Sequence, residues 1–239
     1  MKFRHFYSLP QSASLTAPSS EGAFRIGTNP FVKLKFEEGV TEMEKLIEAV
    51  LGRIFVPLEA SGRHVHLTED QAVTLFGHGL TPERELSQPG QYLCRERVGV
   101  LGPKGEFRNV AVLGPARKEA QVEISLTDGN TLGITPPVRL SGDVKNSPGC
   151  TLIGPKGKVE LSQGVIAAQR HIHLRPEDGV RFGVTDRQVV KLRSFTTRPC
   201  VFEDVVVRID PGFSAAVHLD YDEANGCGFR KGDLGRIIP

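Results

Sequence analysis

The sequence predicts a mainly β protein, built from barrels or sandwiches rather than from alternating helices and strands. Beyond Gly52, apolar residues gather in short runs that alternate or continue for a few positions, as they do in strands. Gly-Pro and Pro-Pro pairs separate these runs at short intervals, a pattern typical of closely connected antiparallel strands. The predicted strands are Val98–Leu101, Val110–Leu113, Gln121–Leu126, Val189–Phe195, Val205–Ile209 and Ala215–Leu219.

An extension and one helix precede these strands. Residues 1–40 are rich in Ser, Pro and Gly and show no sustained periodicity, which is typical of an N-terminal extension outside the core. Thr41 and Glu44 have the spacing of a capping box, and Gly52 is a natural helix end. The apolar residues between them recur at helical spacing: Met43, Leu46, Ile47, Val50 and Leu51. We expect this face to pack on the core; the alternative is a docking helix for a partner shell.

Composition excludes several classes of protein. Hydrophobic residues make up 39% and charged residues 24%, which is ordinary for a globular chain and argues against wholesale disorder. A net charge of +2 is too small to indicate nucleic acid as the main partner. No stretch approaches the roughly 18 apolar residues of a membrane span, and the basic, aromatic N-terminus lacks the apolar core of a secretory signal. We therefore expect a cytoplasmic protein whose four scattered cysteines are reduced.

A repeated motif carries the main functional signal. Residues 63–70 read Arg-His-Val-His-Leu-Thr-Glu-Asp, and residues 170–178 read Arg-His-Ile-His-Leu-Arg-Pro-Glu-Asp. Two related barrels that face each other would explain this repeat. A weaker echo joins Gly-Pro-Lys-Gly at 102–105 to the same tetrapeptide at 154–157, where a recurrent hairpin turn is explanation enough.

The two His-x-His pairs predict metal binding. Side chains at positions i and i+2 of a strand point to the same face, so each pair projects two imidazoles that lie a few ångströms apart. Neutral imidazole is the commonest metal ligand in proteins. A single histidine on a strand is more often structural, but two pairs in the same context favour two metal sites.

A third ligand for each pair must come from elsewhere in the chain. His218 lies in an apolar predicted strand, and Glu123 faces away from its apolar neighbours Val122 and Ile124. The alternatives are a buried structural histidine and a solvated glutamate. Catalytic zinc keeps three protein ligands and one open position. Two such sets fit the sequence: His64, His66 and Glu123, and His171, His173 and His218.

Two arginines, Arg117 and Arg208, lie in or beside these segments. The planar guanidinium fork matches phosphate oxygens, and proximity to the candidate metal strands indicates a phosphate role. The alternative, for each arginine judged singly, is an ordinary surface residue.

Five segments together resemble one known family, the PduL-type phosphate propanoyltransferases. They occur in the same order as in that family and cover about residues 42–239. The segments are 61–67, 113–125, 139–143, 170–174 and 218–225, which include Ser61, Leu113, Arg117, Gln121, Glu123, Ser141, His218 and Asn225.

The resemblance implies two β-barrels capped by short helices, the first of them discontinuous. Carried onto this sequence, barrel domain 1 comprises residues 42–62 plus 169–239, and barrel domain 2 comprises residues 63–168. The resemblance also implies two zinc ions at the interface of the barrels. Their ligands would be His64, His66, Glu123, His171, His173 and His218.

The same resemblance assigns substrates to residues. Arg117 matches a phosphate-binding arginine that would be the catalytic residue, with Gln121, Ser141 and Arg208 as helpers. Ser61, Leu113 and Asn225 match positions that line the coenzyme A site. Two positions depart from the family pattern: Ala111 replaces a frequent basic residue, and Gly226 follows Asn225 where the family has alanine. Neither departure removes a predicted metal ligand.

The implied reaction exchanges coenzyme A and phosphate on a short acyl group, with acyl-CoA, phosphate and acyl phosphate as partners. We expect direct displacement, because no serine or cysteine nucleophile motif is present. The alternatives are a binuclear zinc hydrolase of thioesters or phosphoesters and a non-catalytic zinc-stabilised β-barrel binding protein. Family members of bacterial microcompartments carry a targeting extension, which residues 1–40 would match. A homo-oligomer is expected.

Overall fold

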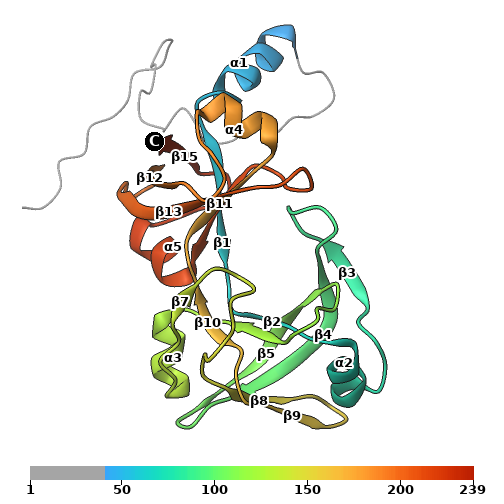
Figure 1. Cartoon of the computed structure of the whole chain (residues 1–239). Coiled ribbons are helices and arrows are strands. Elements are labelled where there is room, and N and C mark those ends of the chain that lie inside the picture. Colours follow the sequence, from blue (N-terminus) through green and yellow to red (C-terminus); the bar gives the residue numbers. More distant parts are fainter. Residues whose placement is uncertain (1–40) are drawn as a thin grey trace, which may run out of the picture. The chain divides into compact units, whose positions relative to one another are not determined.

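The computed structural model describes residues 41–239, which lie within one compact unit. The described part is mainly β, as the sequence predicts (Figure 1). Its strands form two sheets, each with its own apolar core. None of the helices in residues 41–239 is long and apolar enough to cross a bilayer.

The first sheet is a closed six-stranded barrel with the strand order β1-β14-β11-β13-β12-β15. It joins one N-terminal strand to strands from the last third of the chain, and β15 closes it by pairing with β1. The strands are β1 (Val56–Ser61), β11 (His171–Leu174), β12 (Val189–Phe195), β13 (Val201–Ile209), β14 (Ala216–Asp220) and β15 (Leu234–Ile238).

The second sheet takes its strands from residues 64–168 and follows the order β7-β10-β6-β2-β5-β4-β8-β9, with β3 paired to β4. It curls without closing, so only one of the two predicted barrels is a complete one. The predicted domain boundaries remain a prediction, because the described residues all lie within a single unit. The strands are β2 (His64–His66), β3 (Pro82–Glu85), β4 (Tyr92–Leu101), β5 (Glu106–Gly114), β6 (Gln121–Glu123), β7 (Val138–Arg139), β8 (Cys150–Ile153), β9 (Lys158–Leu161) and β10 (Val165–Ala168).

A strand followed by a short capped helix occurs four times, at two strands in each sheet. The helices are α2 (Glu69–Phe76), α3 (Leu126–Leu132), α4 (Pro176–Phe182) and α5 (Tyr221–Cys227), which follow β2, β6, β11 and β14. Each begins after an extended N-cap residue and ends at a glycine with positive φ, a conformation that favours glycine. The predicted strand Gln121–Leu126 is therefore too long, because the Ser125 hydroxyl caps α3.

Along each strand that carries an Arg-His-x-His-Leu motif, successive side chains alternate between the apolar core and the opposite face of the sheet. Val65 and Leu67 are fully buried in the core of the second sheet, and Ile172 and Leu174 are fully buried in the core of the barrel. The histidines between them face the other way. Each Arg-His-x-His-Leu motif thus anchors its strand with apolar residues and presents its imidazoles on the opposite face.

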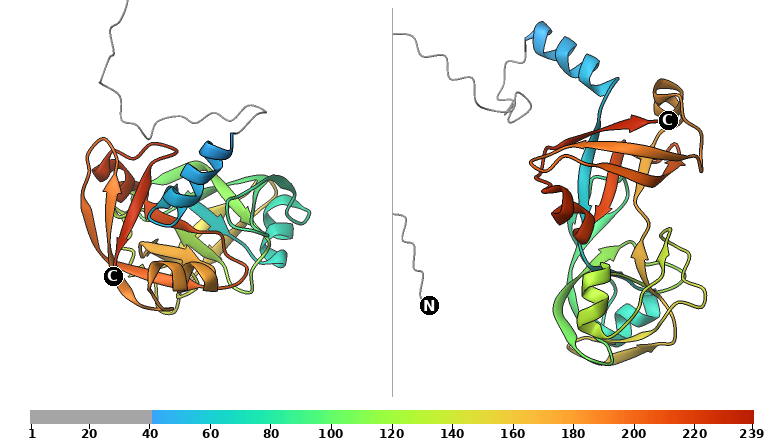
Figure 2. Two further views of the ribbon diagram at one scale, coloured as in Figure 1. Left: turned by 90° about the horizontal axis from the view of Figure 1, so that it is seen from above. Right: turned by 90° about the vertical axis from the view of Figure 1, so that its left-hand side faces the viewer.

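The predicted N-terminal helix is present as α1 (Glu42–Gly52), with the capping box between Thr41 and Glu44. Its predicted packing is wrong: Met43 is 64% exposed, and Leu46, Ile47 and Val50 are also exposed. Helical spacing shows which residues share a face but not what covers it. The α1 helix extends away from the end of the barrel (Figure 2). Residues of the strands and of other helices already fill the barrel core.

The two Gly-Pro-Lys-Gly tetrapeptides are hairpin turns, as expected, and each contacts the end of a helix. The turn between β4 and β5 donates the Lys104 N–H to the Leu132 carbonyl at the end of α3. The turn between β8 and β9 donates the Lys156 N–H to Leu75 near the end of α2. These contacts satisfy carbonyls that a helix end leaves without partners.

Candidate metal centre and its cavity

Strand register places the third predicted ligand opposite the first in both sheets. His64 of β2 lies opposite Glu123 of antiparallel β6, and His171 of β11 lies opposite His218 of antiparallel β14. The second sheet and the barrel therefore use the same arrangement: a His-x-His strand paired with a strand that carries one more ligand. Long-range pairing supplies the residue that the motif alone could not.

The six predicted ligands form two groups that could each hold a metal ion. His64, His66 and Glu123 form one group, and His171, His173 and His218 form the other; within each, the ligand atoms lie within 4.8 Å of one another. Both groups line one cavity of about 450 Å³, together with Arg117 and Arg208. Five of the six side chains are buried, and His218 is half-buried.

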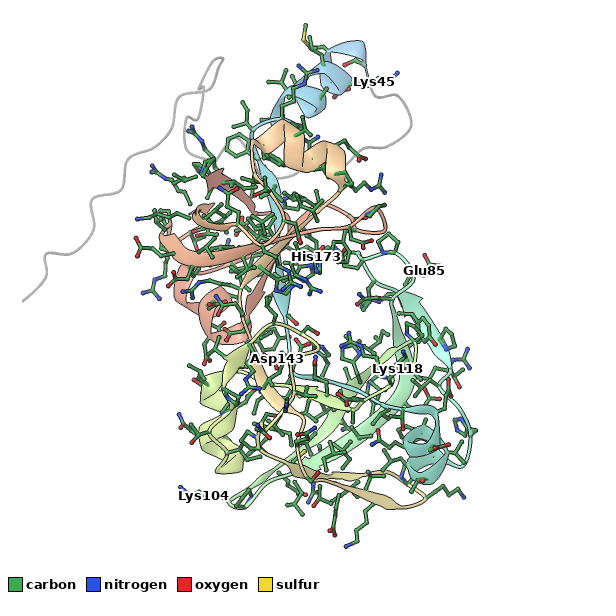
Figure 3. All side chains as sticks on the ribbon, viewed as in Figure 1. Lys45, Glu85, Lys104, Lys118, Asp143 and His173 are labelled. Atoms are coloured by element: carbon green, nitrogen blue, oxygen red, sulfur yellow. The ribbon has the colours of Figure 1, made fainter. Side chains whose placement is uncertain are left out.

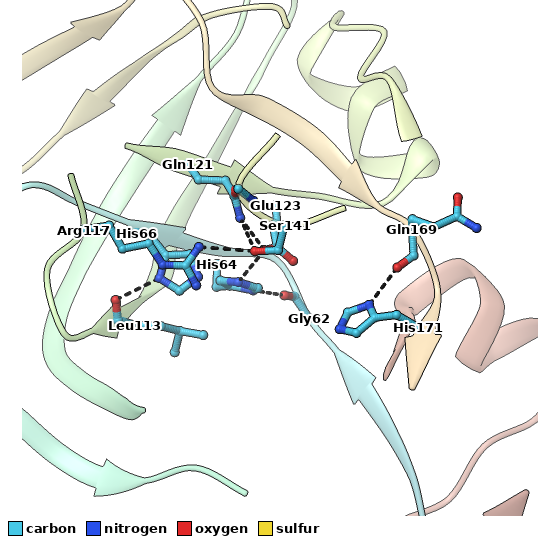
Figure 4. Close-up of polar contacts among 11 residues, drawn as sticks. Gly62, His64, His66, Leu113, Arg117, Gln121, Glu123, Ser141, Gln169 and His171 are labelled. Carbon is cyan, nitrogen blue, oxygen red and sulfur yellow. Dashed lines mark hydrogen bonds and ion pairs between the residues drawn. The ribbon is translucent and has the colours of Figure 1, made fainter. Parts of the chain in front are cut away.

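Backbone carbonyls fix the tautomers of three imidazoles (Figure 4). A carbonyl oxygen only accepts, so the Nδ1 atom that contacts it carries the proton and Nε2 keeps its lone pair for a metal. The Nδ1–carbonyl distances are 2.8 Å for His64 with Gly62, 3.2 Å for His66 with Leu113, and 2.8 Å for His171 with Gln169.

His173 gives the clearest sign that the barrel group fits a metal. It is 6% exposed, and neither of its ring nitrogens has a hydrogen-bond partner within the described structure. A buried polar group without a partner is costly, and native proteins rarely keep one without a reason. Figure 3 shows His173 at the face of the barrel that turns toward the second sheet. A bound cation beside His171 and His218 would take the lone pair of one of these two nitrogens.

Glu123 lies in a network of hydrogen bonds on the second sheet. Its Oε1 atom accepts from the Ser141 hydroxyl at 2.9 Å and lies 3.5 Å from His64 Nε2. Gln121 donates to the same oxygen and to Ser141, and Arg117 Nη1 donates to the Ser141 hydroxyl at 3.2 Å (Figure 4). Gln121 and Ser141 therefore contact the carboxylate ligand directly, and Arg117 is linked to it through Ser141.

Burial keeps most of these imidazoles neutral. Burial, reinforced by neighbouring histidines, lowers the pKa of His66 and His173 to about 2 and that of His171 to about 4. Burial and then the charge of Arg208 lower the pKa of His218 to about 4. A neutral imidazole has a free lone pair, so these four histidines are in the form that binds a metal.

His64 and Glu123 behave as a coupled pair. Burial favours the neutral form of His64, but the charge of Glu123, its hydrogen bond and the Gly62 carbonyl together outweigh burial and raise the pKa of the imidazole. Burial likewise opposes ionisation of Glu123, but His64, His66 and the Ser141 hydrogen bond together outweigh burial and hold the pKa of the carboxyl well below its usual value. Glu123 is therefore an anion, the form that a metal ligand requires.

We expect the metal-free protein to lose stability as the pH falls below about 6.5, the pKa of histidine in an unfolded chain. Four histidines have lower pKa values when folded, so below 6.5 the unfolded chain binds protons that the folded chain does not. Each costs about 1.4 kcal/mol per pH unit until its folded pKa is reached. His64, whose pKa is raised, acts in the opposite direction. Urea unfolding of chelated protein at pH 7.5 and 5.5 measures this; an equal midpoint at both would contradict it.

The arginine of each motif ties the histidine strand to a helix. Arg63 forms a two-pronged pair with Asp128 of α3, with distances of 3.0 and 2.6 Å. Arg170 pairs with Glu223 of α5. Since α3 and α5 follow the strands that carry Glu123 and His218, these pairs fix the position of both opposing strands.

Two other arginines bring positive charge to the cavity wall. The Arg117 N–H donates to the Leu67 carbonyl at 2.8 Å, which holds this residue beside the first motif. Arg208 lies opposite His173 in the parallel ladder between β11 and β13. Burial lowers the pKa of both guanidinium groups, but from a value so high that both remain cations.

Of the remaining predicted site residues, some lie at the cavity and one does not. Ser61, Leu113 and Ser141 line the cavity, and Gln121 reaches it through Ser141 and Glu123. Asn225 lies exposed on α5 and is not among the described lining residues, so its coenzyme A contact remains a prediction.

Sequence reasoning missed several lining residues, which lie in loops, in β1 and at the start of α5. They include Glu59, Ser87, Gln88, Phe213 and Tyr221. Gln88 precedes a Pro-Gly pair, which signals a turn rather than a site. Phe213 follows another Pro-Gly pair, and nothing local marks it.

Comparison with known proteins identifies the family. Residues 57–230 match the sequence profile of the phosphate propanoyltransferases. Proteins named phosphate propanoyltransferase from Listeria monocytogenes and Clostridioides difficile are 52% and 47% identical, over 81% and 82% of this chain and 93% and 97% of their own lengths. One from Thermotoga maritima is 49% identical over 74% of this chain and 86% of its own. The chain therefore belongs to the phosphate propanoyltransferase family and is an acyltransferase.

Proposed function

We propose that this enzyme converts acyl-CoA and phosphate into acyl phosphate and coenzyme A at a site that holds two zinc ions, on a short acyl group. The observation that carries the proposal is the convergence of two three-ligand groups and two arginines on one cavity. Three protein ligands leave an open position for a substrate. Neither group contains cysteine, which most structural zinc sites do.

His64, His66 and Glu123 would hold one ion, and His171, His173 and His218 the other. Zinc supplies Lewis-acid polarisation to oxygen or sulfur atoms that bind at its open position. The protein contributes fixed tautomers at His64, His66 and His171 and an ionised carboxylate at Glu123. These features favour a preformed site that needs little rearrangement to load metal.

Arg117 and Arg208 are the groups suited to phosphate. A guanidinium binds two phosphate oxygens in one plane, which fixes the anion's orientation as well as its place. The Ser141 hydroxyl, which contacts Arg117 and Glu123, holds Arg117 toward the cavity. Positioned phosphate would attack the thioester carbonyl carbon while the arginines balance its charge.

The reaction we propose is a direct displacement. An oxygen of hydrogen phosphate forms a bond to the acyl carbon, the carbon–sulfur bond breaks, and coenzyme A leaves as a thiolate that takes up the proton released by the phosphate. Cys227 is an unsuitable nucleophile because it is fully buried, and burial raises the pKa of its thiol. No cysteine is among the described residues that line the cavity. An acyl group trapped on Ser141, or on any other side chain, would rule out direct displacement.

Ser61 and Leu113 are the proposed contacts for coenzyme A in the cavity. Residues 1–40, which lie outside the described residues, remain the proposed microcompartment-targeting segment, and a homo-oligomer remains a prediction.

An assay with propanoyl-CoA separates transfer from hydrolysis. We expect thiol release to require phosphate and to be matched by acyl phosphate, trapped as its hydroxamate. A binuclear zinc hydrolase would release thiol at the same rate in phosphate-free buffer and give only the free acid. That result would replace the transferase proposal with the hydrolase.

A further inference from the structure

Gln88 is a buried amide in the loop between β3 and β4. It is only 3% exposed, although glutamine is usually a surface residue. The loop belongs to the second sheet, but the side chain reaches residues of the barrel more than a hundred positions away in sequence. A buried amide needs partners for both its oxygen and its nitrogen.

Both partners come from the backbone of one residue, Ser214. Gln88 Nε2 donates to the Ser214 carbonyl at 3.0 Å, and the Ser214 N–H donates to Gln88 Oε1 at 3.1 Å. The amide thus pairs with Ser214 as a neighbouring strand would, through one donor and one acceptor. Two bonds in a closed ring fix the peptide more tightly than either bond alone.

Ser214 directly follows Phe213 and lies two residues before the start of β14. The Phe213 ring lies against His173, with centroids 4.1 Å apart, and the Arg208 guanidinium carbon lies 5.6 Å from the same ring. Phe213 therefore packs against the predicted ligand His173 and against the predicted phosphate-binding residue Arg208. Fixing Ser214 fixes this ring.

The same loop also reaches the edge of His218. Gln88 Nε2 lies 3.5 Å from His218 Nε2, and Glu59 Oε2 lies 3.8 Å from the same nitrogen. Ser87, the preceding residue, donates its hydroxyl to Glu59 Oε2 at 2.6 Å. Ser87 thus holds Glu59 beside this imidazole, and Gln88 itself lies on the same edge of the ring.

We propose that Ser87 and Gln88 form a latch between the two sheets that positions His218 and Phe213. Gln88 is the main positioning residue, since it is buried and makes two backbone hydrogen bonds, whereas Ser87 makes one exposed hydrogen bond. The latch rests on the proposed function, because its purpose is to keep the barrel ligands in a geometry that binds metal. It acts through other residues and touches none of the reacting atoms.

Gln88→Met tests the latch, because methionine has a similar length but cannot make the two amide bonds. The probe is Co²⁺ added to chelated protein and followed by its visible absorption. We expect one of the two Co²⁺ ions to bind about 10- to 100-fold more weakly, as typically follows the loss of a group that orients a metal ligand. The other ion should bind as in wild type. Hydrogen exchange of the Ser214 amide should become at least about tenfold faster in the metal-free variant.

Gln163→Met is the matched control. Gln163 accepts one hydrogen bond from the Asn146 backbone at 3.0 Å in a loop away from the cavity, so this variant should keep both Co²⁺ affinities and the Ser214 exchange rate. Circular dichroism verifies that both variants fold, and Ser87→Ala should show a smaller loss of affinity at the same ion.

The latch would be overturned if Gln88→Met bound both Co²⁺ ions as tightly as wild type and its Ser214 amide exchanged at the wild-type rate. Equal weakening of both ions would overturn it too, because the latch contacts only the barrel group. A wild-type protein that binds no Co²⁺ would overturn the proposed metal site instead, and Ser214 exchange would then decide the latch by itself.

Discussion

His173→Leu is expected to lose transferase activity by about 10³-fold while making the metal-free protein more stable. The activity loss follows from removing one of three ligands: Lewis-acid stabilisation is worth several kcal/mol, and each 1.36 kcal/mol is tenfold in rate. The stability gain follows from burial. His173 is 6% exposed with two unpartnered ring nitrogens, and leucine buries no polar atom there.

Opposite signs distinguish a functional residue from a structural one. A histidine kept for packing would lower stability when replaced, whereas one kept for a metal leaves the metal-free protein better packed. Ile172→Val is the matched control, since Ile172 is the preceding residue of β11 and faces the barrel core. It should cost about 0.5 to 1.5 kcal/mol of stability and keep the activity.

Urea unfolding of chelated proteins and phosphate-dependent thiol release measure both effects. A His173→Leu variant that is less stable without metal, or that keeps full activity, would contradict the assignment.

Arg117→Ala is expected to lower kcat/KM for phosphate by about 10²- to 10³-fold, with a much smaller effect on KM for acyl-CoA. Arg117 lines the cavity, contacts Ser141 and remains a cation despite burial. Losing a charge-assisted, bidentate contact to an anion in a site of this kind costs about 3 to 4 kcal/mol, which corresponds to this range of rates. Arg117→Lys should recover only part of the loss, because an ammonium keeps the charge without the planar fork.

Steady-state kinetics with each substrate varied in turn separate these effects. Arg181→Lys serves as the control, since Arg181 pairs with Asp178 on α4 and is not part of the described cavity lining. If Arg117→Ala raised KM for acyl-CoA and left that for phosphate unchanged, Arg117 would belong to the coenzyme A site instead.

Local patterns predict much of this site, because its main geometry is that of a single strand. The alternation of His64 and His66 with Val65 and Leu67 is visible in the sequence, and the structure has it on β2. The capping box at Thr41 is equally local. Both depend only on residues a few positions apart.

Features that depend on register or on loops were harder to predict. In the sequence, Glu123 is equally a solvated glutamate on an exposed strand face, and only the ladder between β2 and β6 sets it opposite His64. Gln88 looks like a turn residue until the fold brings Ser214 to it. The exposed face of α1 shows the same limit, since amphipathic spacing cannot say what lies beside a helix.

Reconstitution of chelated enzyme with zinc tests the central claim most directly. Metal per chain and phosphate-dependent transfer are measured on the same samples as zinc is added. We predict negligible transfer without metal and full activity at about two zinc ions per chain, the number that the two ligand groups can hold. Full transferase activity in protein shown to contain no metal would contradict it.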